Sequence, residues 1–333
     1  MTMIYIPSGK YLEGEHPEMD VGIEGWFTLR ALNRYGRVVR ERTFKERRRE
    51  VGPFHNLLLN NGLNRFATQL PESAYRYCHV GLGTATPAVT DSQLSNFLAN
   101  VSLSLPVEAV SNSGSPNYYS ARTFQWTSAI GALGTNNLTE VGISGTSTNG
   151  NLFSRELIRD GGGSPTSFPI ASTEQLQVTY ELRIYPKLTD TLATVNISGV
   201  NYDTTTRGLA ISSTSDWGPQ TCAPAGGTNY NVASKVGGSI AAFSGAMVAN
   251  TTGSTGISGS LGGATSILEG SYSGDTHHKS TQATWSTTAG NGNIATIRWP
   301  FYCACFQIGY SPAIPKTSAK TLLLNQRISW ARR

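Results

Sequence analysis

The sequence predicts an all-β protein with two β-sandwich, jelly-roll-like domains and one short helix in the first domain. Charged residues make up 14% of the 333 positions, against roughly 25% in an average globular protein. Glycine occupies 36 positions, and Ser, Thr and Asn are abundant throughout. Turn-forming and β-branched residues in these proportions favour strands joined by loops over helices.

The clearest single segment is the run 176–185, in which apolar and polar residues alternate without a break. Alternation with a period of two is typical of a strand with one buried and one solvated face. The face predicted to be buried carries Leu176, Val178, Tyr180, Leu182 and Ile184.

Two shorter runs, 138–144 and 152–158, precede this strand and predict an antiparallel meander. The pair Asn149-Gly150 in the loop between them supplies the positive φ angles that a hairpin turn requires. Gly142, inside the first run, predicts a place where another backbone approaches closely.

The remaining segments of the first half fit one sandwich over residues 21–186, after an extended arm at 1–20. A hairpin is predicted with strands at 26–32 and 38–44. Leucine spacing predicts a helix at 55–69, ended by Pro71. Further strands are expected at 75–82, 99–110 and 118–128, and one helical turn at 90–95.

Residues 186–190 predict a hinge, and residues 191–333 a second, Gly/Ser/Thr-rich sandwich. Short strands separated by long loops are expected within 239–248 and 257–268. Residues 294–308 alternate as one strand, and 321–330 alternate as the last strand.

Basic residues are concentrated in the predicted hairpin. Nine of the 26 Arg and Lys residues lie between Arg30 and Arg49, next to an arm that carries several carboxylates. Aromatic residues for base stacking are not interleaved among these arginines, which disfavours nucleic acid as the partner. A solvated edge strand rich in basic residues stays open as one alternative. We predict instead that these charges make contacts between subunits, since arginine grips a carboxylate with two hydrogen bonds. The predicted contact residues are Arg34, Arg37, Arg40, Arg42, Lys45, Arg47, Arg48, Arg49, Glu13, Glu15 and Glu18.

No segment predicts an active site, a cofactor site or a metal site, so the chain is not expected to be an enzyme. The pair His277-His278 points to opposite faces if extended, which argues against a metal centre. The four cysteines fit small buried residues kept reduced. No apolar run of about 18 residues occurs, and no signal peptide is recognisable, so we expect synthesis in a cytoplasm without membrane insertion.

Several motifs occur in an order and spacing that resemble tailed-bacteriophage virion proteins of the tail and tail-fibre kind. They are Asn56-Leu-Leu-Leu-Asn-Asn-Gly-Leu-Asn64, Val80-Gly-Leu-Gly-Thr-Ala-Thr-Pro-Ala88, Asn137-Leu-Thr-Glu-Val-Gly-Ile143, Gly150-Asn-Leu-Phe-Ser-Arg-Glu-Leu-Ile158, Leu176-Gln-Val-Thr-Tyr-Glu-Leu-Arg-Ile-Tyr-Pro186, Ser311-Pro-Ala-Ile-Pro-Lys-Thr317 and Arg327-Ile-Ser-Trp-Ala-Arg332.

This resemblance implies a structural component of the virion, in the tail, fibre or baseplate adhesion apparatus, made in the cytoplasm of a bacterial host. The first sandwich would dock onto the particle through subunit contacts. The implied partners are further copies of the chain, with a trimer as the first expectation, and other tail or neck proteins. Three alternatives stay open: a tail protein that binds a host receptor or surface glycan, a collar or neck protein, and a polysaccharide depolymerase.

Overall fold

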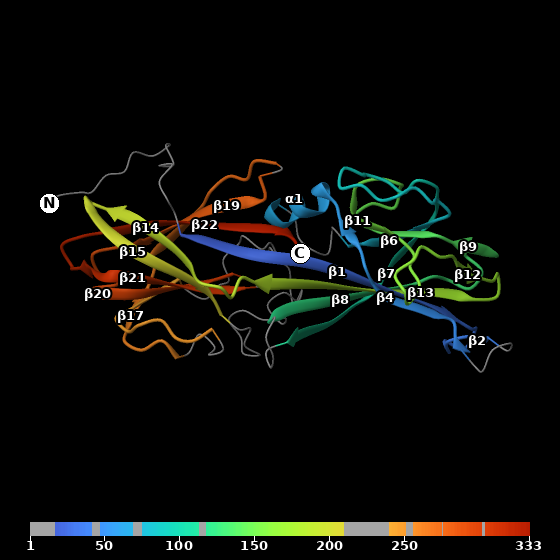
Figure 1. Ribbon diagram of the computed structural model, residues 1–333, viewed down its shortest axis with the longest axis horizontal. Coiled ribbons are helices and arrows are strands. Elements are labelled where there is room, and N and C mark those ends of the chain that lie inside the picture. Colours follow the sequence, from blue (N-terminus) through green and yellow to red (C-terminus); the bar gives the residue numbers. More distant parts are fainter. Residues whose placement is uncertain are drawn as a thin grey trace.

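The computed structural model describes residues 17–41, 47–68, 75–112, 118–209, 240–250, 256–274, 276–301 and 304–333. These residues form an elongated all-β molecule, which confirms the predicted fold class, and helix α1 (Asn60–Thr68) is the short helix. Figure 1 shows β1 running along the middle of the long axis. Of the predicted arm, residues 1–16 lie outside the described residues, whereas Glu18 already begins β1.

The larger sheet contains twelve strands, and strand β1 is an interior strand that pairs with three others. β1 pairs antiparallel with β13 and β4, and parallel with β22. In hydrogen-bonding order the strands are β18 (Ser266–Glu269), β19 (His278–Trp285), β22 (Leu322–Arg332), β1 (Glu18–Leu32), β13 (Gln175–Pro186), β8 (Tyr119–Thr127), β7 (Phe97–Asn112), β6 (Tyr77–Gly81), β10 (Glu140–Ser144), β11 (Leu152–Leu157) and β5 (Leu57–Leu58), with β4 (Glu50–His55) on β1.

One end of this sheet packs against its own middle, and aromatic side chains fill the space between. Tyr75, just before β6, lies 4.7 Å from the ring of Phe153 on β11 and 4.4 Å from that of Phe124 on β8. The Tyr180 ring of β13 lies 4.9 Å from Phe27 on β1. Such ring contacts add about 1 kcal/mol each beyond the burial of their area. The Tyr75 contacts join the two layers of the first sandwich, whereas Phe27 and Tyr180 are cross-strand neighbours within one layer.

The smaller sheet has six strands and lies at the end of the molecule away from the first sandwich (Figure 1). In order they are β14 (Thr191–Ile197), β15 (Val200–Gly208), β21 (Cys305–Lys316), β20 (Gly292–Pro300), β16 (Ala241–Phe243) and β17 (Ser260–Gly263). Gln326 of β22 donates to the Tyr310 hydroxyl of β21 across 3.5 Å, so the two sheets meet there. One apolar cluster runs through both, from Met19 to Trp330.

The sheets do not follow the predicted division at residues 186–190. Strands β18, β19 and β22, all from the predicted second domain, complete the sheet built on β1. β22 pairs with β1 from Glu18↔Arg327 to Ile23↔Arg332. The alternation of the last strand indicated its buried face, but nothing in that pattern identifies a parallel partner some 300 residues away.

The strand 176–185 is β13, with the predicted side chains facing the core. Gly142 also meets the prediction, because a Cβ there would lie 2.8 Å from the Ser154 carbonyl oxygen. The helix is shorter than the predicted 55–69. Its expected first residues pair as strands instead, His55 with Trp26 and Leu58 with Ser154.

The predicted hairpin differs more. A turn at 33–37 is present, closed by the Asn33 side chain, which accepts the N–H groups of Tyr35 and Arg37. Beyond the Leu32↔Val38 bridge, the returning chain leaves β1 and forms a small ribbon of β2 (Arg40–Glu41) and β3 (Arg47–Arg48). On the side of β1 away from β13, the antiparallel partner at this end is β4, and residues 42–44 of the predicted strand lie outside the described residues.

Two other expectations are wrong. The run 294–308 was predicted as one strand but is a hairpin of β20 and β21, closed where Phe301 donates its N–H to the Ala304 carbonyl. The prediction missed the chain reversal because the residues on both sides of it are apolar. Segment 90–95 forms turns, not a helical turn, and Asp91 accepts the N–H of Ala88.

A further ribbon pairs β9 (Asn136–Leu138) with β12 (Phe168–Ile170).

Candidate contact surfaces

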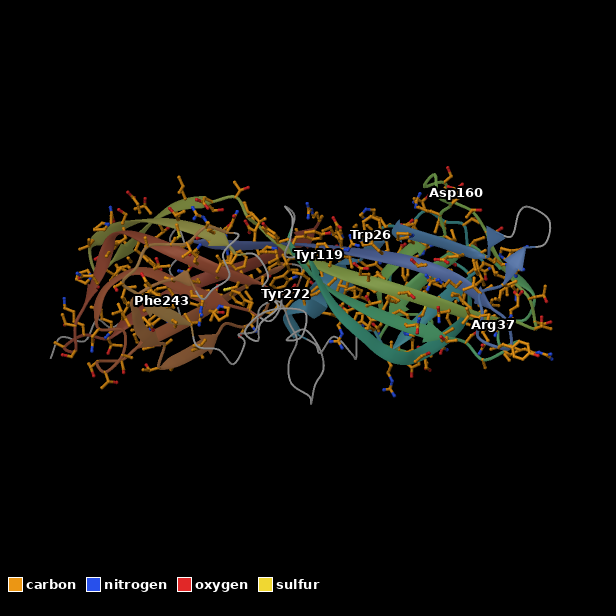
Figure 2. The ribbon with its side chains drawn as sticks, turned by 90° about the horizontal axis from the view of Figure 1, so that it is seen from below. Trp26, Arg37, Tyr119, Asp160, Phe243 and Tyr272 are labelled. Carbon is orange, nitrogen blue, oxygen red and sulfur yellow. The ribbon has the colours of Figure 1, made fainter. Side chains whose placement is uncertain are left out.

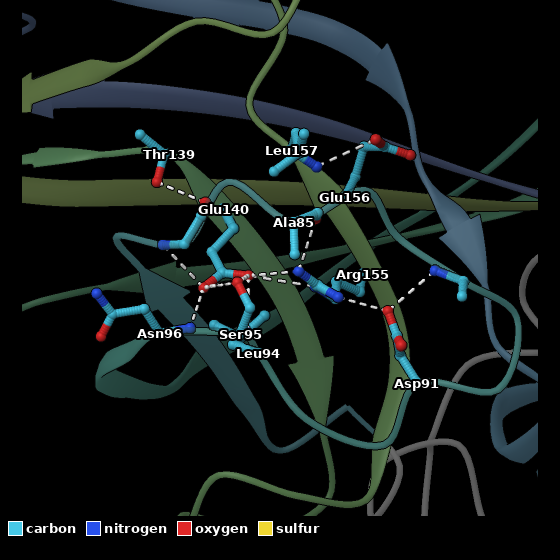
Figure 3. A network of polar contacts seen from close by, with 12 residues as sticks. Ala85, Asp91, Leu94, Ser95, Asn96, Thr139, Glu140, Arg155, Glu156 and Leu157 are labelled. Carbon is cyan, nitrogen blue, oxygen red and sulfur yellow. Dashed lines mark hydrogen bonds and ion pairs between the residues drawn. The ribbon is translucent and has the colours of Figure 1, made fainter.

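A buried ion pair between β10 and β11 lies within a network of polar contacts (Figure 3). Glu140 is 0% exposed, and its Oε2 lies 2.9 Å from Arg155 Nη2 and 3.2 Å from Arg155 Nε. The Arg155 guanidinium also bonds the Asp91 carboxylate and the Ala85 carbonyl oxygen. Two charges are tolerated in this interior because each has an opposite charge and several hydrogen bonds.

The Glu140 carboxylate also accepts backbone N–H groups from a loop. Gly83, Ser95 and Asn96 donate to it across 3.0, 3.1 and 2.7 Å. Because its lone pairs are occupied and no part of it reaches solvent, Glu140 is not placed to act as an acid or base on a substrate. This network therefore fastens the loop 82–96 to the sheet.

The end of the chain is attached to helix α1 by a second set of polar contacts. Trp330 donates its indole N–H to the Leu63 carbonyl across 2.9 Å. Arg332 bonds the Leu58 carbonyl and the Asn60 side chain. Gly62 faces β11 so closely that a Cβ would lie 2.1 Å from the Phe153 carbonyl oxygen. Strand β22, helix α1 and strand β11 thus form one connected unit.

These two networks join segments that carry the sequence resemblance. The Glu140–Arg155 network connects the motifs at 80–88, 137–143 and 150–158. The α1 contacts connect the motifs at 56–64, 150–158 and 327–332. The sequence contained one signal for the Glu140–Arg155 pair: Glu140 lies within the apolar run 138–144 and Arg155 within the run 152–158. A charge buried in such a run requires an opposite charge nearby.

The basic turn, residues 33–37, lies at one end of the molecule. Arg34 stacks on Tyr35 at 4.7 Å from the ring centroid and donates to its hydroxyl across 2.6 Å. The Tyr35 side chain is 68% exposed, and Arg37 is exposed as well. This turn therefore presents guanidinium groups and one aromatic ring to solvent (Figure 2 labels Arg37).

The structure places the other predicted contact residues as follows. Arg49 pairs with Glu174 of the same chain across 2.5 Å, and Glu18 pairs with Arg327. Arg40, Arg47 and Arg48 belong to the β2–β3 ribbon beside the basic turn. Residues that lie outside the described part of the chain are Glu13, Glu15, Arg42 and Lys45.

Glu18 and the basic turn lie at opposite ends of β1 (Figure 1). The strand has 15 residues, which at about 3.3 Å each span roughly 50 Å. The described end of the acidic arm and the basic turn of one molecule are therefore far apart. An arm-to-hairpin contact of the predicted kind would require the ends of different molecules to meet.

A row of stacked aromatic and cationic side chains crosses the outer face of the large sheet. Arg183 of β13 lies 5.1 Å from the Trp26 ring and 4.8 Å from the Tyr119 ring. The row continues through Tyr185, 5.2 Å from Tyr119, to Arg333, 4.0 Å from Tyr185. Trp26 and Tyr119 lie near the middle of the molecule in Figure 2. The sequence placed Arg183 and Tyr185 on the outward face, but the cross-strand register that brings the row together was not predictable.

A pocket of about 350 Å³ lies at the end of this row. Its lining combines the rings of Tyr118 and Tyr185 with the charged groups of Asp20, Lys187 and Arg333. Burial raises the pKa of the Tyr185 phenol, which donates to Glu24 across 3.0 Å. Lys187 and Asp20 pair across 3.2 Å at the rim. Aromatic rings beside charged groups form a small site with both apolar and polar surface.

Across the described ranges, no three His, Cys, Asp or Glu side chains are grouped to hold a metal ion. None of the helical segments in the described part of the chain has the length and apolar character needed to cross a bilayer. Comparison of the chain with protein-family models, curated proteins and solved structures gives no match.

Proposed function

We propose that the chain is a structural component of a tailed-phage virion, located in the tail, fibre or baseplate adhesion apparatus and made in the cytoplasm of the host. It acts through contacts with other copies of itself and with other tail or neck proteins, and not through catalysis. The motifs that resemble phage tail proteins give the proposal its starting point.

The observation that carries the proposal is the connection between those motifs. Glu140, Arg155 and Gly83 come from three separate motifs and bond one another in the interior. Trp330 and Leu63 connect two more. Residues that bond each other are the ones a shared scaffold needs to keep, so motifs connected in this way support a resemblance that extends to the fold of the first sandwich.

Location is tested by imaging the phage that encodes the chain with a bound antibody. We expect label at the tail or its distal apparatus in purified particles. Particles that carry no label, while lysates contain the protein, would overturn the proposal.

The role of the basic turn is tested by charge reversal. Arg49 is left intact because it pairs with Glu174 within the chain. We expect the combined variant Arg34→Glu, Arg37→Glu, Arg47→Glu and Arg48→Glu to fold and yet to be excluded from particles. The control, Lys320→Glu, changes an exposed cation in another loop and should assemble normally. Normal assembly of the fourfold variant would show that neither the basic turn nor strand β3 makes an essential subunit contact.

A second candidate function, binding of a host surface glycan, is favoured by the pocket beside Tyr118 and Tyr185. Sugar rings stack on aromatic faces. The hydroxyl groups of a sugar donate hydrogen bonds to carboxylates and accept them from ammonium and guanidinium groups. We expect glycan-array binding by the full chain to be lost in Tyr118→Ala and retained in Tyr35→Ala, which removes an exposed ring elsewhere. Absence of binding by the unaltered chain would exclude this candidate.

A further inference from the structure

Strand β14 is an edge of the six-stranded sheet and bonds β15 along one side. Its pairing runs without a bulge from Thr191↔Thr206 to Ile197↔Val200. The seven residues, Thr-Leu-Ala-Thr-Val-Asn-Ile, contain no charged residue and no proline. Edge strands in soluble proteins are usually short, charged, bulged or interrupted by proline, because an open edge pairs readily with another strand.

The other described sheet edges carry such protection. β17 and β18 have four residues each and β5 has two. β17 also contains Gly262 at a φ of 106° and pairs with β16 through a register shift. β4 contains Pro53, and its pairing with β1 is broken between Phe27 and Leu29. Among the described edges, β14 is therefore the long and regular one.

The direction of its backbone groups follows from the hairpin turn. Ser198 and Gly199 have φ angles of 55° and 85°, as in a two-residue hairpin loop. Residues flanking such a loop bond each other, so Ile197, Val195 and Ala193 direct their backbone groups toward β15. A hydrogen bond supports this direction for Ala193, because its carbonyl oxygen accepts the Thr204 hydroxyl of β15 across 3.0 Å.

Leu192, Thr194 and Asn196 therefore direct their N–H and C=O groups away from β15. No backbone bond joins these three to other described loops or turns. The side chains of Thr194 and Asn196 bond Asp203 and Asn201 of β15, so they do not cover the edge. The Leu192 side chain is 76% exposed.

We infer that β14 is a self-association surface, on which β14 of a second copy of this chain pairs antiparallel about a two-fold axis at Thr194. In this register Thr194 faces Thr194 of the other copy, and Leu192 faces its Asn196. Every outward N–H then meets an outward C=O, which is the pairing that an antiparallel ladder requires. The strand is thus complementary to itself.

Charge and packing favour a second copy over a different partner. The neutral strand brings no like charges together across the axis and offers no charge by which to select another protein. The face toward the core carries Val195 and Ile197, which are partly buried and pack against the apolar cluster. Pairing places the Val195 side chains of one copy beside Ala193 of the other and extends both cores.

This inference deepens the proposed function by naming a surface through which copies meet. A two-fold contact joins copies in pairs, so the trimer implied by the resemblance would need a different surface. One added strand pair buries little area, so the isolated dimer is weak and gains strength from repetition in an assembly.

The test is sedimentation of the purified full chain over a range of concentrations. We expect the unaltered chain to form a dimer as concentration rises. Thr194→Pro removes an outward N–H and keeps the backbone bonds to β15, losing only the side-chain bond to Asp203, so it should raise the dimer dissociation constant roughly tenfold or more. Thr194→Lys and Thr194→Glu should each weaken the dimer, because like charges meet at the axis. An equimolar mixture of the two should dimerise again.

The matched control is Thr205→Lys, which adds the same charge on β15, beside Leu192 but away from the edge. It should dimerise like the unaltered chain. A chain that stays monomeric at every concentration overturns the inference. Variants that weaken association without recovery on mixing also overturn it, because the side chains at position 194 of two copies would then not meet across an axis. Neither outcome bears on whether the protein is found in the virion, which the labelled particles test separately.

Discussion

Leu182 and Arg183 are neighbours in sequence that lie on opposite faces of β13. Leu182 is 6% exposed and belongs to the apolar cluster. The Arg183 guanidinium lies on the outer face between the rings of Trp26 and Tyr119 and pairs with Glu181 across 2.6 Å. The outward position predicted for Arg183 is confirmed, but its side chain is stacked between rings and not simply solvated.

We predict that Leu182→Asp prevents stable folding, because a buried charge without a partner costs several kcal/mol. Arg183→Asp should leave a folded chain that is less stable by about 1 kcal/mol, the size of a partly exposed cation–π contact. Urea denaturation followed by tryptophan fluorescence measures both. Equal loss of soluble protein for the two variants would mean that the strand register is shifted by one residue.

His79 provides a pH-dependent contribution to stability. The side chain is 0% exposed, and its Nε2 donates to the Thr146 carbonyl across 2.8 Å. Nδ1 is buried without a hydrogen-bond partner, so protonation would create an unpaired N–H. Burial lowers the pKa of His79, and the Thr146 bond offsets part of that effect.

The lowered pKa fixes the direction of the pH effect. The unfolded chain binds this proton near pH 6.5, above the pKa of the folded state. The stability that His79 contributes is therefore complete above pH 6.5 and is lost as pH falls toward the folded pKa, by up to about 1.4 kcal/mol per pH unit. We predict that His79→Gln reduces this slope when free energies of unfolding are compared between pH 7.5 and pH 5. If the slope of the free energy of unfolding against pH is unchanged in His79→Gln, the pH dependence arises from other titratable groups.

Helix α1 depends on a glycine that a helix would ordinarily avoid. Replacing glycine by alanine inside a helix is usually stabilising by about 1 kcal/mol. At Gly62 the added methyl would lie 2.1 Å from the Phe153 carbonyl oxygen, so the helix would have to move away from β11. We predict that Gly62→Ala destabilises the chain by roughly 1–3 kcal/mol, as overpacking does elsewhere. Thermal unfolding measures the difference.

The control for this change is Gly161→Ala, since nothing lies within 4 Å of the position where its Cβ would be. It should be neutral or slightly stabilising, because it restricts the unfolded chain. If Gly62→Ala also proved neutral, α1 and β11 would be further apart than the structure places them.

The arrangement of β22 makes the first sandwich depend on the end of the chain. β22 lies between β1 and β19, and Trp330 is 2% exposed. We predict that a fragment of residues 1–190 does not fold cooperatively, because it loses β22, the parallel partner of β1, and the Trp330–Leu63 bond. Circular dichroism during heating measures this. A sharp unfolding transition in the fragment would support the predicted independent domain at 21–186.

Local sequence pattern predicted the strands well and their partners poorly. The alternation in 176–185 indicated β13 and its buried face, and Gly142 indicated a close backbone. The continuous apolar run around Phe301 hid a chain reversal, and the leucines near Leu58 fitted a helix as well as a strand. Such runs carry no information on direction, because a buried residue looks the same whether the chain continues or turns.

Composition and alternation were enough to establish an all-β chain, one short helix and the core-facing residues of its central strands. They could not establish that β22 pairs with β1, that Glu140 meets Arg155, or that Trp26, Arg183 and Tyr119 form one row. Burial of a side chain depends on its own face of a strand, a period that can be read locally. Pairing depends on which distant segments lie side by side, and that is decided by the packing of the folded chain as a whole.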